Sequence, residues 1–347
     1  MEKIRLGLIG CGGMMKHHAC GIQDLDCVEI TAVCDVEKER AEDVATILNS
    51  PYVTTDYRTM VDFVDAVLVV LPHHLHYPCG MFFARHKKHI LMEKPLCNTE
   101  EECLKLIETC EEMDVTLMCA YPVRYWPGIV KLKELIDSGD YGKIMQMSIW
   151  TEQLTIFEDT HWLGTSCIGG GQFFSHGCHY IDILLWFCGK PVSGAHFGTN
   201  VGTPWLLREG TSAATIKFEN GSLGYHAGTW GARGTRLGGD FQIMAEKAML
   251  EYDPTSGEVR VYENENIHVP GEEPEASREY KVVWKRGSKF GKQTQNEVKH
   301  FVDCVINKKT PETDGRSALE SLRVIWKMYD AEKTGTLADL RGIGFDK

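Results

Sequence analysis

The first 120 residues alternate between two hydrophobic periods, and this alternation limits the fold more than any other feature of the sequence. Short, mainly apolar runs predict strands at 4–9, 28–34, 66–71, 89–92 and 115–120. The run 66–71 is continuously apolar, which is typical of a strand that is buried on both faces. Apolar residues at helical spacing cover 41–48, 76–85 and 100–113, the last capped by Asn98 or Thr99. Strands and helices that alternate with short loops predict an α/β domain with a parallel, doubly wound sheet.

Beyond Tyr121 the pattern changes to longer strands with alternating polarity. We expect strands at 144–151, 213–218, 222–230, 241–244, 259–262 and 280–284. We expect helices at about 172–187, 295–307 and 316–333, and an exposed loop at 270–277. Successive strands of this kind predict an α+β domain with a large, mostly antiparallel open sheet. The predicted domains are 1–122 and 123–347, and the last helices can pack back on the first domain.

Composition excludes several classes of partner and site. A formal net charge of −12 disfavours nucleic acid, because an acidic chain repels phosphate backbones. No apolar run approaches the length of a membrane span, and no secretory leader precedes the first strand. Thirteen cysteines without a CxxC pair, several in apolar runs (Cys34, Cys119, Cys178, Cys188), indicate buried thiols. We therefore expect a cytoplasmic protein.

A glycine turn follows the first strand, in GLIGCGGMM. Gly10 would allow a tight turn, and Gly12, followed by Gly13, would let the backbone approach a pyrophosphate at a helix N-terminus. The third position of the G-x-G-x-x-G pattern is Met15, next to Met14, instead of glycine or alanine. In its place after a first strand, the turn predicts a dinucleotide site.

An acidic residue after the second strand bears on the choice of dinucleotide. Asp35 ends AVCD, where a carboxylate can accept hydrogen bonds from a ribose 2′-hydroxyl and repel a 2′-phosphate. Lys38 and Arg40 are close enough to leave NADP open. The sequence favours NAD.

In HILMEKPL, a predicted strand ends at a lysine that directly precedes a proline. Ligands of an open parallel sheet bind beyond the carboxyl ends of its strands, and Lys94 stands at that edge. Pro95 restricts the Lys94 backbone and can adopt the cis form. A partly desolvated lysine there would donate a hydrogen bond to a substrate hydroxyl and stabilise developing alkoxide charge.

A polar stripe runs along an otherwise apolar helix in GGGQFFSHGCHYIDILLWF. Ser175, His179 and Asp182 are spaced four and three apart and share one face, and His176 borders it. Gly177 in the helix interior implies that another group packs closely against it. His179 has the ordinary imidazole chemistry of a base near neutral pH. His73, His74 and His76 lack acidic partners for a metal site, so we expect no metal and read them as loop histidines.

The stretches LVVLPHHLH and HILMEKPL resemble the paired signature of the glucose–fructose oxidoreductase, inositol dehydrogenase and rhizopine catabolism family (Gfo/Idh/MocA). Pro72 and His76 match the loop of the first stretch, and Leu71 stands where threonine is usual. Glu93, Lys94 and Pro95 match the E-K-P motif fully. The resemblance implies an N-terminal Rossmann domain, a nicotinamide cofactor close to His76, and homodimers or homotetramers.

The helix stripe resembles the family's D-x-G-x-H-x-x-D pattern. Gly177, His179 and Asp182 match it, but Ser175 replaces the first aspartate, and His176 can take over part of that role. The resemblance implies catalysis by Lys94 and His179, with Ser175 and His176 as further candidates. It also implies a cofactor site that we assign to Gly10, Gly12, Gly13, Met14, Met15, Asp35, Arg40, Leu71, Pro72, His73, His76, Glu93, Lys94 and Pro95.

These residues predict an NAD-dependent dehydrogenase that oxidises a secondary hydroxyl of a sugar, glycoside or inositol. The candidate substrate contacts are Lys94, Tyr121, Arg124, Tyr125, Trp162, Ser175, His176, Tyr180 and His179. Three alternatives stay open: a glycosidase that works through transient oxidation by bound NAD, a reductase of a keto-sugar, imine or biliverdin-like substrate, and a non-catalytic regulator that binds NAD.

Overall fold

The computed structural model describes residues 3–158, 161–165, 170–263, 278–287 and 294–344. The chain forms two compact units, each made of two chain segments. The first unit comprises Met1–Tyr125 and Lys292–Leu322, and the second comprises Trp126–Gly291 and Arg323–Lys347. The expected boundary at residue 122 lies three residues before this division, and 292–322 join the first unit.

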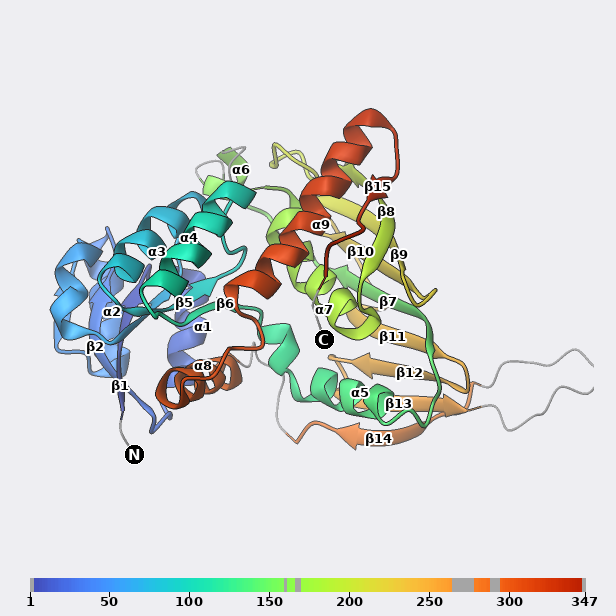
Figure 1. Ribbon diagram of the computed structural model, residues 1–347, viewed down its shortest axis with the longest axis horizontal. Coiled ribbons are helices and arrows are strands. Elements are labelled where there is room, and N and C mark those ends of the chain that lie inside the picture. The colour runs from blue at the N-terminus through green and yellow to red at the C-terminus, as the bar shows by residue number, and fades with distance from the viewer. Residues whose placement is uncertain (1–2, 159–160, 166–169, 264–277, 288–293, 345–347) are drawn as a thin grey trace, which may run out of the picture. The chain divides into compact units, whose positions relative to one another are not determined.

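A six-stranded parallel sheet forms the centre of the first unit (Figure 1). Its strands in spatial order are β3 (Tyr52–Thr54), β2 (Val28–Cys34), β1 (Ile4–Ile9), β4 (Ala66–Val69), β5 (His89–Glu93) and β6 (Leu117–Ala120). The order reverses between β1 and β4, as in doubly wound folds. The four residues of β4 are all buried, because helices cover both faces of such a sheet.

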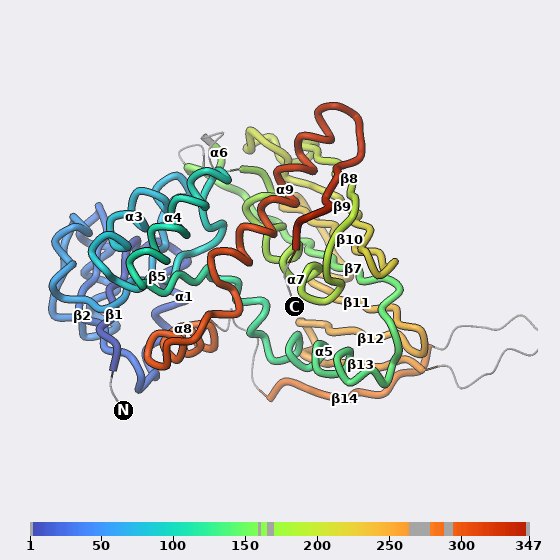
Figure 2. Tube along the Cα trace, in the orientation of Figure 1, coloured from blue at the N-terminus to red at the C-terminus, as the bar shows by residue number. Residues whose placement is uncertain are grey.

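Five α-helices cover this sheet. They are α1 (Gly13–Ile22), α2 (Lys38–Leu48), α3 (His76–Arg85), α4 (Glu100–Glu112) and α8 (Gln295–Asn307). α1, α2 and α8 share one apolar core with the strands, and α8 contacts α1 although their first residues, Gly13 and Gln295, are 282 positions apart in the sequence (Figure 2). α3 packs on α4 and on β4 and β5. The hydroxyl of Thr99 caps α4 by accepting the Glu102 N–H at 3.2 Å.

A nine-stranded sheet forms the second unit. In spatial order it contains β14 (Lys281–Lys285), β13 (Glu258–Glu263), β12 (Ala248–Asp253), β11 (Gly239–Ala245), β7 (Ile144–Glu152), β10 (Leu223–Thr229), β9 (Thr211–Phe218), β8 (Pro191–Thr199) and β15 (Ala338–Asp339). Neighbouring strands run antiparallel, except that β7 and β10 are parallel. The sheet is therefore mostly antiparallel, as the alternating strands predicted.

Helices pack on this sheet. α5 (Pro127–Asp137) lies against β12, β13 and β14, and α7 (Cys178–Cys188) lies against β7 and β10. α6 (Trp162–Thr165) is one turn long, and α9 (Gly315–Thr334) begins in the first unit and ends in the second. In the part of the chain that the structure describes, no helix is long and apolar enough to cross a membrane.

Most expected elements occur within a few residues of their predicted bounds. The sequence analysis missed α5, α6, β3, β8, β12 and β15. It also predicted a single helix at about 172–187, where the structure has a π-helical turn, Phe173–Gly177, followed by α7. The expected loop at 270–277 lies outside the described residues. Cys34, Cys119, Cys178 and Cys188 are buried free thiols, as predicted.

Candidate functional site

The carboxyl ends of four parallel strands bring the predicted cofactor residues to one edge of the first unit. Gly10 follows β1, Asp35 follows β2, Leu71 comes two residues after β4, and Lys94 follows β5. β1 pairs with both β2 and β4, and β4 pairs with β5, so these residues lie at successive strand ends. Ligands of open α/β sheets bind at this edge, where the strand order reverses.

Gly10 is required by both conformation and space. Its φ of +85° is a left-handed conformation that favours glycine. A Cβ at this position would also lie 2.1 Å from the carbonyl oxygen of Val70, at the end of β4. Glycine is therefore required in the tight turn predicted after the first strand, because the neighbouring strand leaves no room for a side chain.

The start of α1 has the features of an anion site. A Cβ on Gly12 or Gly13 would meet no atom of the described residues within 4 Å, so a ligand can approach the backbone there. No side chain caps the helix through Gly12, and its first turn has no acidic residue. Backbone N–H groups at a helix start favour a phosphate. Met14 is half-buried, but the Met15 side chain lies in the apolar core and cannot reach a ligand there.

Asp35 ties the glycine turn to the second strand. One carboxylate oxygen accepts the Cys11 N–H at 2.6 Å, and the other accepts the Glu37 N–H at 2.9 Å. Each oxygen keeps a lone pair, so the predicted contact with a ribose hydroxyl stays a prediction. Two basic side chains nearby are engaged with carboxylates: Lys38 pairs with Glu42 at 3.0 Å and Arg40 with Glu37 at 2.9 Å.

His76 joins the two loops that carry the family signature. Its Nδ1 lies 2.8 Å from the carbonyl oxygen of Pro95, and its Nε2 lies 2.8 Å from that of Leu71. The ring is fully buried, and burial lowers the pKa of His76 although both carbonyls oppose that shift. His73 stands beside it at 5.7 Å between ring centroids, and Pro72 immediately precedes this turn. The structure thus gives His76 a role in holding the loops, and its closeness to a nicotinamide stays a prediction.

Lys94 is held by its neighbours in the E-K-P motif. Its backbone N–H donates to Oε2 of Glu93 at 3.1 Å, and the Lys94–Pro95 peptide bond is cis. Oε1 of Glu93 lies 2.8 Å from Nε2 of His18, on α1. Burial raises the pKa of Glu93, but His18 and Lys94 outweigh it and leave that pKa below its ordinary value. Glu93 is therefore an inward-facing carboxylate, which differs from its predicted contact with the cofactor.

Two of the predicted substrate contacts make bonds inside the first unit. The Arg124 guanidinium donates to the carbonyl oxygen of Glu312 at 3.2 Å and is buried. The Tyr125 hydroxyl lies 3.4 Å from that of Thr313, and burial raises the pKa of Tyr125. These hydrogen bonds join the segment that ends at Tyr125 to the segment that follows α8. Tyr121 is fully buried in the same unit.

The predicted histidine stripe lies at the junction of the π-helical turn and α7. Ser175 and His179 are buried, and Asp182 is fully buried. The His176 and His179 rings are 5.9 Å apart and nearly perpendicular. Nε2 of His176 also lies 3.4 Å from the Tyr180 hydroxyl. The structure therefore groups the two histidines, and π-helical turns occur often at functional sites.

Close packing explains Gly177, as the sequence predicted. A Cβ there would lie 2.8 Å from Cδ2 of Phe173 and 3.4 Å from Cε1 of His226. The Tyr180 ring stacks on His226 at 5.0 Å, so Tyr180 packs against the sheet, and burial raises its pKa. Burial also lowers the pKa of His226 to about 3.

Glu209, in the loop between β8 and β9, anchors the start of this helical segment. Its Oε1 accepts the Phe173 N–H at 3.2 Å and the Tyr329 O–H at 2.5 Å. A Cβ on Gly171 would overlap the Glu209 carboxylate, which accounts for a glycine there. Trp162, a predicted substrate contact, lies on α6 with its ring beside His161.

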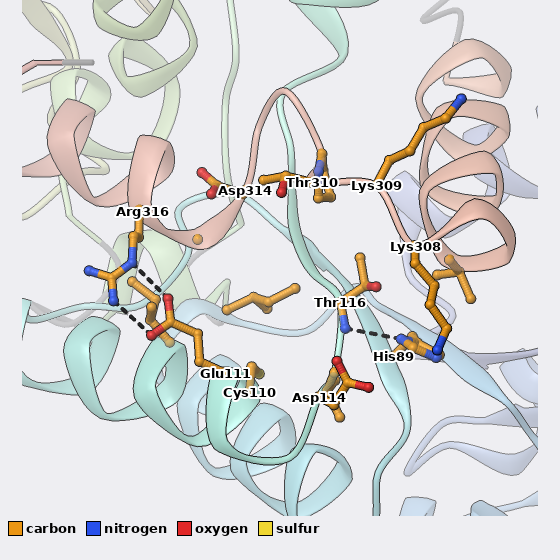
Figure 3. A pocket seen from close by; sticks show the side chains of 16 residues that line it. His89, Cys110, Glu111, Asp114, Thr116, Lys308, Lys309, Thr310, Asp314 and Arg316 are labelled. Carbon is orange, nitrogen blue, oxygen red and sulfur yellow. Dashed lines mark hydrogen bonds and ion pairs between the residues drawn. The ribbon is translucent and has the colours of Figure 1, made fainter. Parts of the chain in front are cut away.

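A cavity of the first unit lies at the opposite edge of its sheet (Figure 3). Its volume is about 500 Å³, and it opens beside His89 and Leu117, where β5 and β6 begin. Glu111 and Arg316 form an ion pair at 2.7 Å on its wall. Because the glycine turn and Lys94 follow the carboxyl ends of strands, this cavity is separate from the candidate cofactor site. In the ranges that the structure describes, no cluster of side chains is arranged to bind a metal ion.

The sequence analysis did not single out His18, Glu297 or Glu209. A signal for His18 existed, because it shares a helical face with the buried Met15 and Ile22. A polar residue on such a face needs a buried partner. Nothing in the local sequence identifies that partner as Glu93.

Comparison with known proteins supports the assignment of both units. Residues 4–121 match the oxidoreductase family with an NAD-binding Rossmann fold, and residues 129–251 match the GFO/IDH/MocA C-terminal domain. D-xylose 1-dehydrogenase [NADP(+)] of Haloarcula marismortui is 24% identical over 95% of this chain and 91% of its own length. Myo-inositol 2-dehydrogenase of Thermotoga maritima is 25% identical over 64% of this chain and 67% of its own.

Other curated relatives match over 53 to 66% of their own length. Among solved structures, levoglucosan dehydrogenase in complex with NADH and L-sorbose has a TM-score of 0.86 and 18% identity, over 99% of this chain and 100% of its own. That likeness shows the shared fold. The two matched domains establish that the chain belongs to the GFO/IDH/MocA family of oxidoreductases, with an NAD-binding Rossmann domain.

Proposed function

We propose that this protein is an NAD-dependent dehydrogenase that oxidises a secondary hydroxyl of a sugar, glycoside or inositol. The observation that carries the proposal is the position of Lys94, held by Glu93 at the strand edge that also bears the glycine turn. Relatives named as D-xylose and myo-inositol dehydrogenases support the substrate class.

The proposed chemistry divides between the two units. His179 accepts the proton of the substrate hydroxyl, and Lys94 donates a hydrogen bond to the same oxygen and stabilises its developing negative charge. NAD, when bound, accepts the hydride from that carbon. Ser175 and His176, next to His179, hold other hydroxyls of the substrate. The remaining candidate contacts of the substrate are Trp162, Tyr121, Arg124 and Tyr125. Arg124 and Tyr125 affect the substrate indirectly, by holding the loop in which they lie.

The first unit offers the groups that NAD requires. The uncapped start of α1 suits the pyrophosphate, and the open space at Gly12 and Gly13 lets it approach the backbone. Asp35 suits the ribose hydroxyls. The ion pair between Arg40 and Glu37 leaves Arg40 less available to a 2′-phosphate, which favours NAD over NADP.

The test is a panel of sugars, glycosides and inositols with NAD or NADP, followed by the absorbance of the reduced cofactor. For the best substrate, Lys94→Met should lower kcat by at least about 100-fold, because it removes a hydrogen bond to developing charge. NAD binding, measured by calorimetry, should stay within a factor of a few. Lys308→Met, beside the cavity at the opposite sheet edge, is the matched control and should keep wild-type turnover.

Two outcomes would overturn the proposal. Near-normal turnover of Lys94→Met would remove the lysine from the chemistry. Release of free sugar without accumulation of NADH would instead indicate a glycosidase that oxidises its substrate only transiently. A homodimer or homotetramer stays a prediction, and light scattering tests it.

A further inference from the structure

Three buried side chains lie in a row behind Lys94 in the first unit. Nε2 of His18 lies 2.8 Å from Oε1 of Glu93, and Nδ1 of His18 lies 3.9 Å from Oε1 of Glu297. His18 comes from α1, Glu93 from the end of β5, and Glu297 from the first turn of α8. His18 and Glu297 are fully buried. We call these three residues the acid–imidazole chain.

The two carboxyl groups of this chain have opposite surroundings. Both oxygens of Glu93 are engaged, one with His18 and the other with the Lys94 N–H. Neither oxygen of Glu297 has a hydrogen-bond partner among the described residues. Burial, and then the charge of Glu93, raise the pKa of Glu297 well above its ordinary value. Groups of this kind divide into one charged and one neutral member, because two charges cannot both be buried cheaply.

The contact with Glu93 determines which ring nitrogen of His18 is protonated. At 2.8 Å, the charged oxygen of Glu93 requires N–H at Nε2. Nδ1 of His18 and Oε1 of Glu297 are 3.9 Å apart, which is too far for a hydrogen bond, and neither atom has a hydrogen-bond partner among the described residues. The other titratable groups that act on Glu93 are Lys94 and His76, and Tyr125 lies near Glu297.

We propose that the acid–imidazole chain is a positioning device for Lys94: His18 holds the Glu93 carboxylate from α1, and Glu93 in turn fixes the Lys94 backbone at the sheet edge. The same bond joins the helix that starts at the glycine turn to the strand that carries the lysine. Mobility or loss of the Glu93 carboxylate therefore displaces the ammonium relative to the cofactor edge. This inference depends on the proposed function, because it requires that Lys94 acts in turnover.

The activity test compares two substitutions of His18 in the full-length protein with the best substrate of the panel. His18→Leu removes the donor and should lower kcat at least about tenfold, since misplacement of a catalytic group by about 1 Å has such effects. His18→Gln restores an N–H donor of similar length and should recover to within about threefold of wild type. His17→Gln, an exposed neighbour on the same helix, is the control and should behave as wild type.

A second measurement does not depend on whether these variants fold. In the wild-type protein with ¹⁵N-labelled histidine, the His18 imidazole should show a protonated Nε2 at pH 7 by NMR. Glu297→Gln, which mimics a protonated carboxyl, should keep Nε2 protonated.

An unprotonated Nε2 in the wild type, or equal kcat of His18→Leu and wild type, would overturn the inference. If Lys94→Met itself retains turnover, the proposed function fails first. If Lys94→Met is inactive and His18→Leu is not impaired, only the positioning device fails.

Discussion

Asp240 gives the second unit a pH-dependent stability. It lies at the start of β11, opposite Trp150 of β7, and is 3% exposed. One oxygen accepts the Gln242 side-chain N–H at 3.0 Å, and the other has no hydrogen-bond partner among the described residues. Burial, and then the charge of Glu251, raise the pKa of Asp240 from 3.8 to about 7. The folded state therefore favours the protonated acid.

The sign and size of the effect follow from this shift. A carboxyl group with a raised pKa in the folded state contributes most below its unfolded pKa, and the contribution is lost as the pH rises through the folded pKa. The shift from 3.8 to about 7 is about 3 pH units, and each unit corresponds to about 1.4 kcal/mol. Asp240 should thus destabilise the second unit by about 4 kcal/mol at pH 8 relative to pH 3. Asp240→Asn removes this dependence and can keep the hydrogen bond from Gln242.

The assay is urea unfolding from pH 5 to pH 8. All eight tryptophans lie in the second unit, so their fluorescence reports its unfolding selectively. The free energy of unfolding of Asp240→Asn minus that of wild type should grow by about 3 kcal/mol between pH 5 and pH 8. Asp140→Asn, an exposed aspartate of the same unit, should give a constant difference. A constant difference for Asp240→Asn would refute the reasoning, because the folded pKa would then be ordinary.

Three further predictions concern the turn, the helix and its anchor. Asp35→Ser should raise the KM for NAD about tenfold or more, because the contact with the ribose hydroxyls is lost, and should change the KM for NADP less. Steady-state kinetics with both cofactors test this, and equal changes in the two KM values would contradict a ribose contact. Gly177→Ala should lower the free energy of unfolding by about 1 to 3 kcal/mol, since its Cβ would lie 2.8 Å from the Phe173 ring, whereas Gly234→Ala, which has open space, should not. Glu209→Gln should cost about 1 to 2 kcal/mol in the same urea assay, because a charged acceptor of the Phe173 N–H and the Tyr329 O–H is lost; an effect no larger than that of the exposed Glu219→Gln would contradict that role.

The strands of the first unit other than β3 were predictable, because parallel strands are buried on both faces and are therefore mainly apolar, whereas the three residues of β3 are only half-buried. β1 and β2 occur at their predicted bounds. The strand β8 was missed because PVSGAHFGT contains proline and two glycines and has no strict alternation, and pairing with β9 and β15 overrides its weak propensity. The π-helical turn was missed because helical spacing is nearly the same in both forms over five residues.

The E-K-P motif shows why part of the site could not be read from the sequence. Topology alone placed Lys94 at the functional edge, since a residue after a parallel strand must lie there. The role of Glu93 depends on His18, which is 75 residues away, and on Glu297, which lies in the second chain segment of the unit. Periodicity identifies which face of an element is buried, but it does not identify the buried partner on another element. In the sequence, His18 could be recognised as a polar residue on the buried face of α1. Its contact with Glu93 forms only when α1, β5 and α8 pack together.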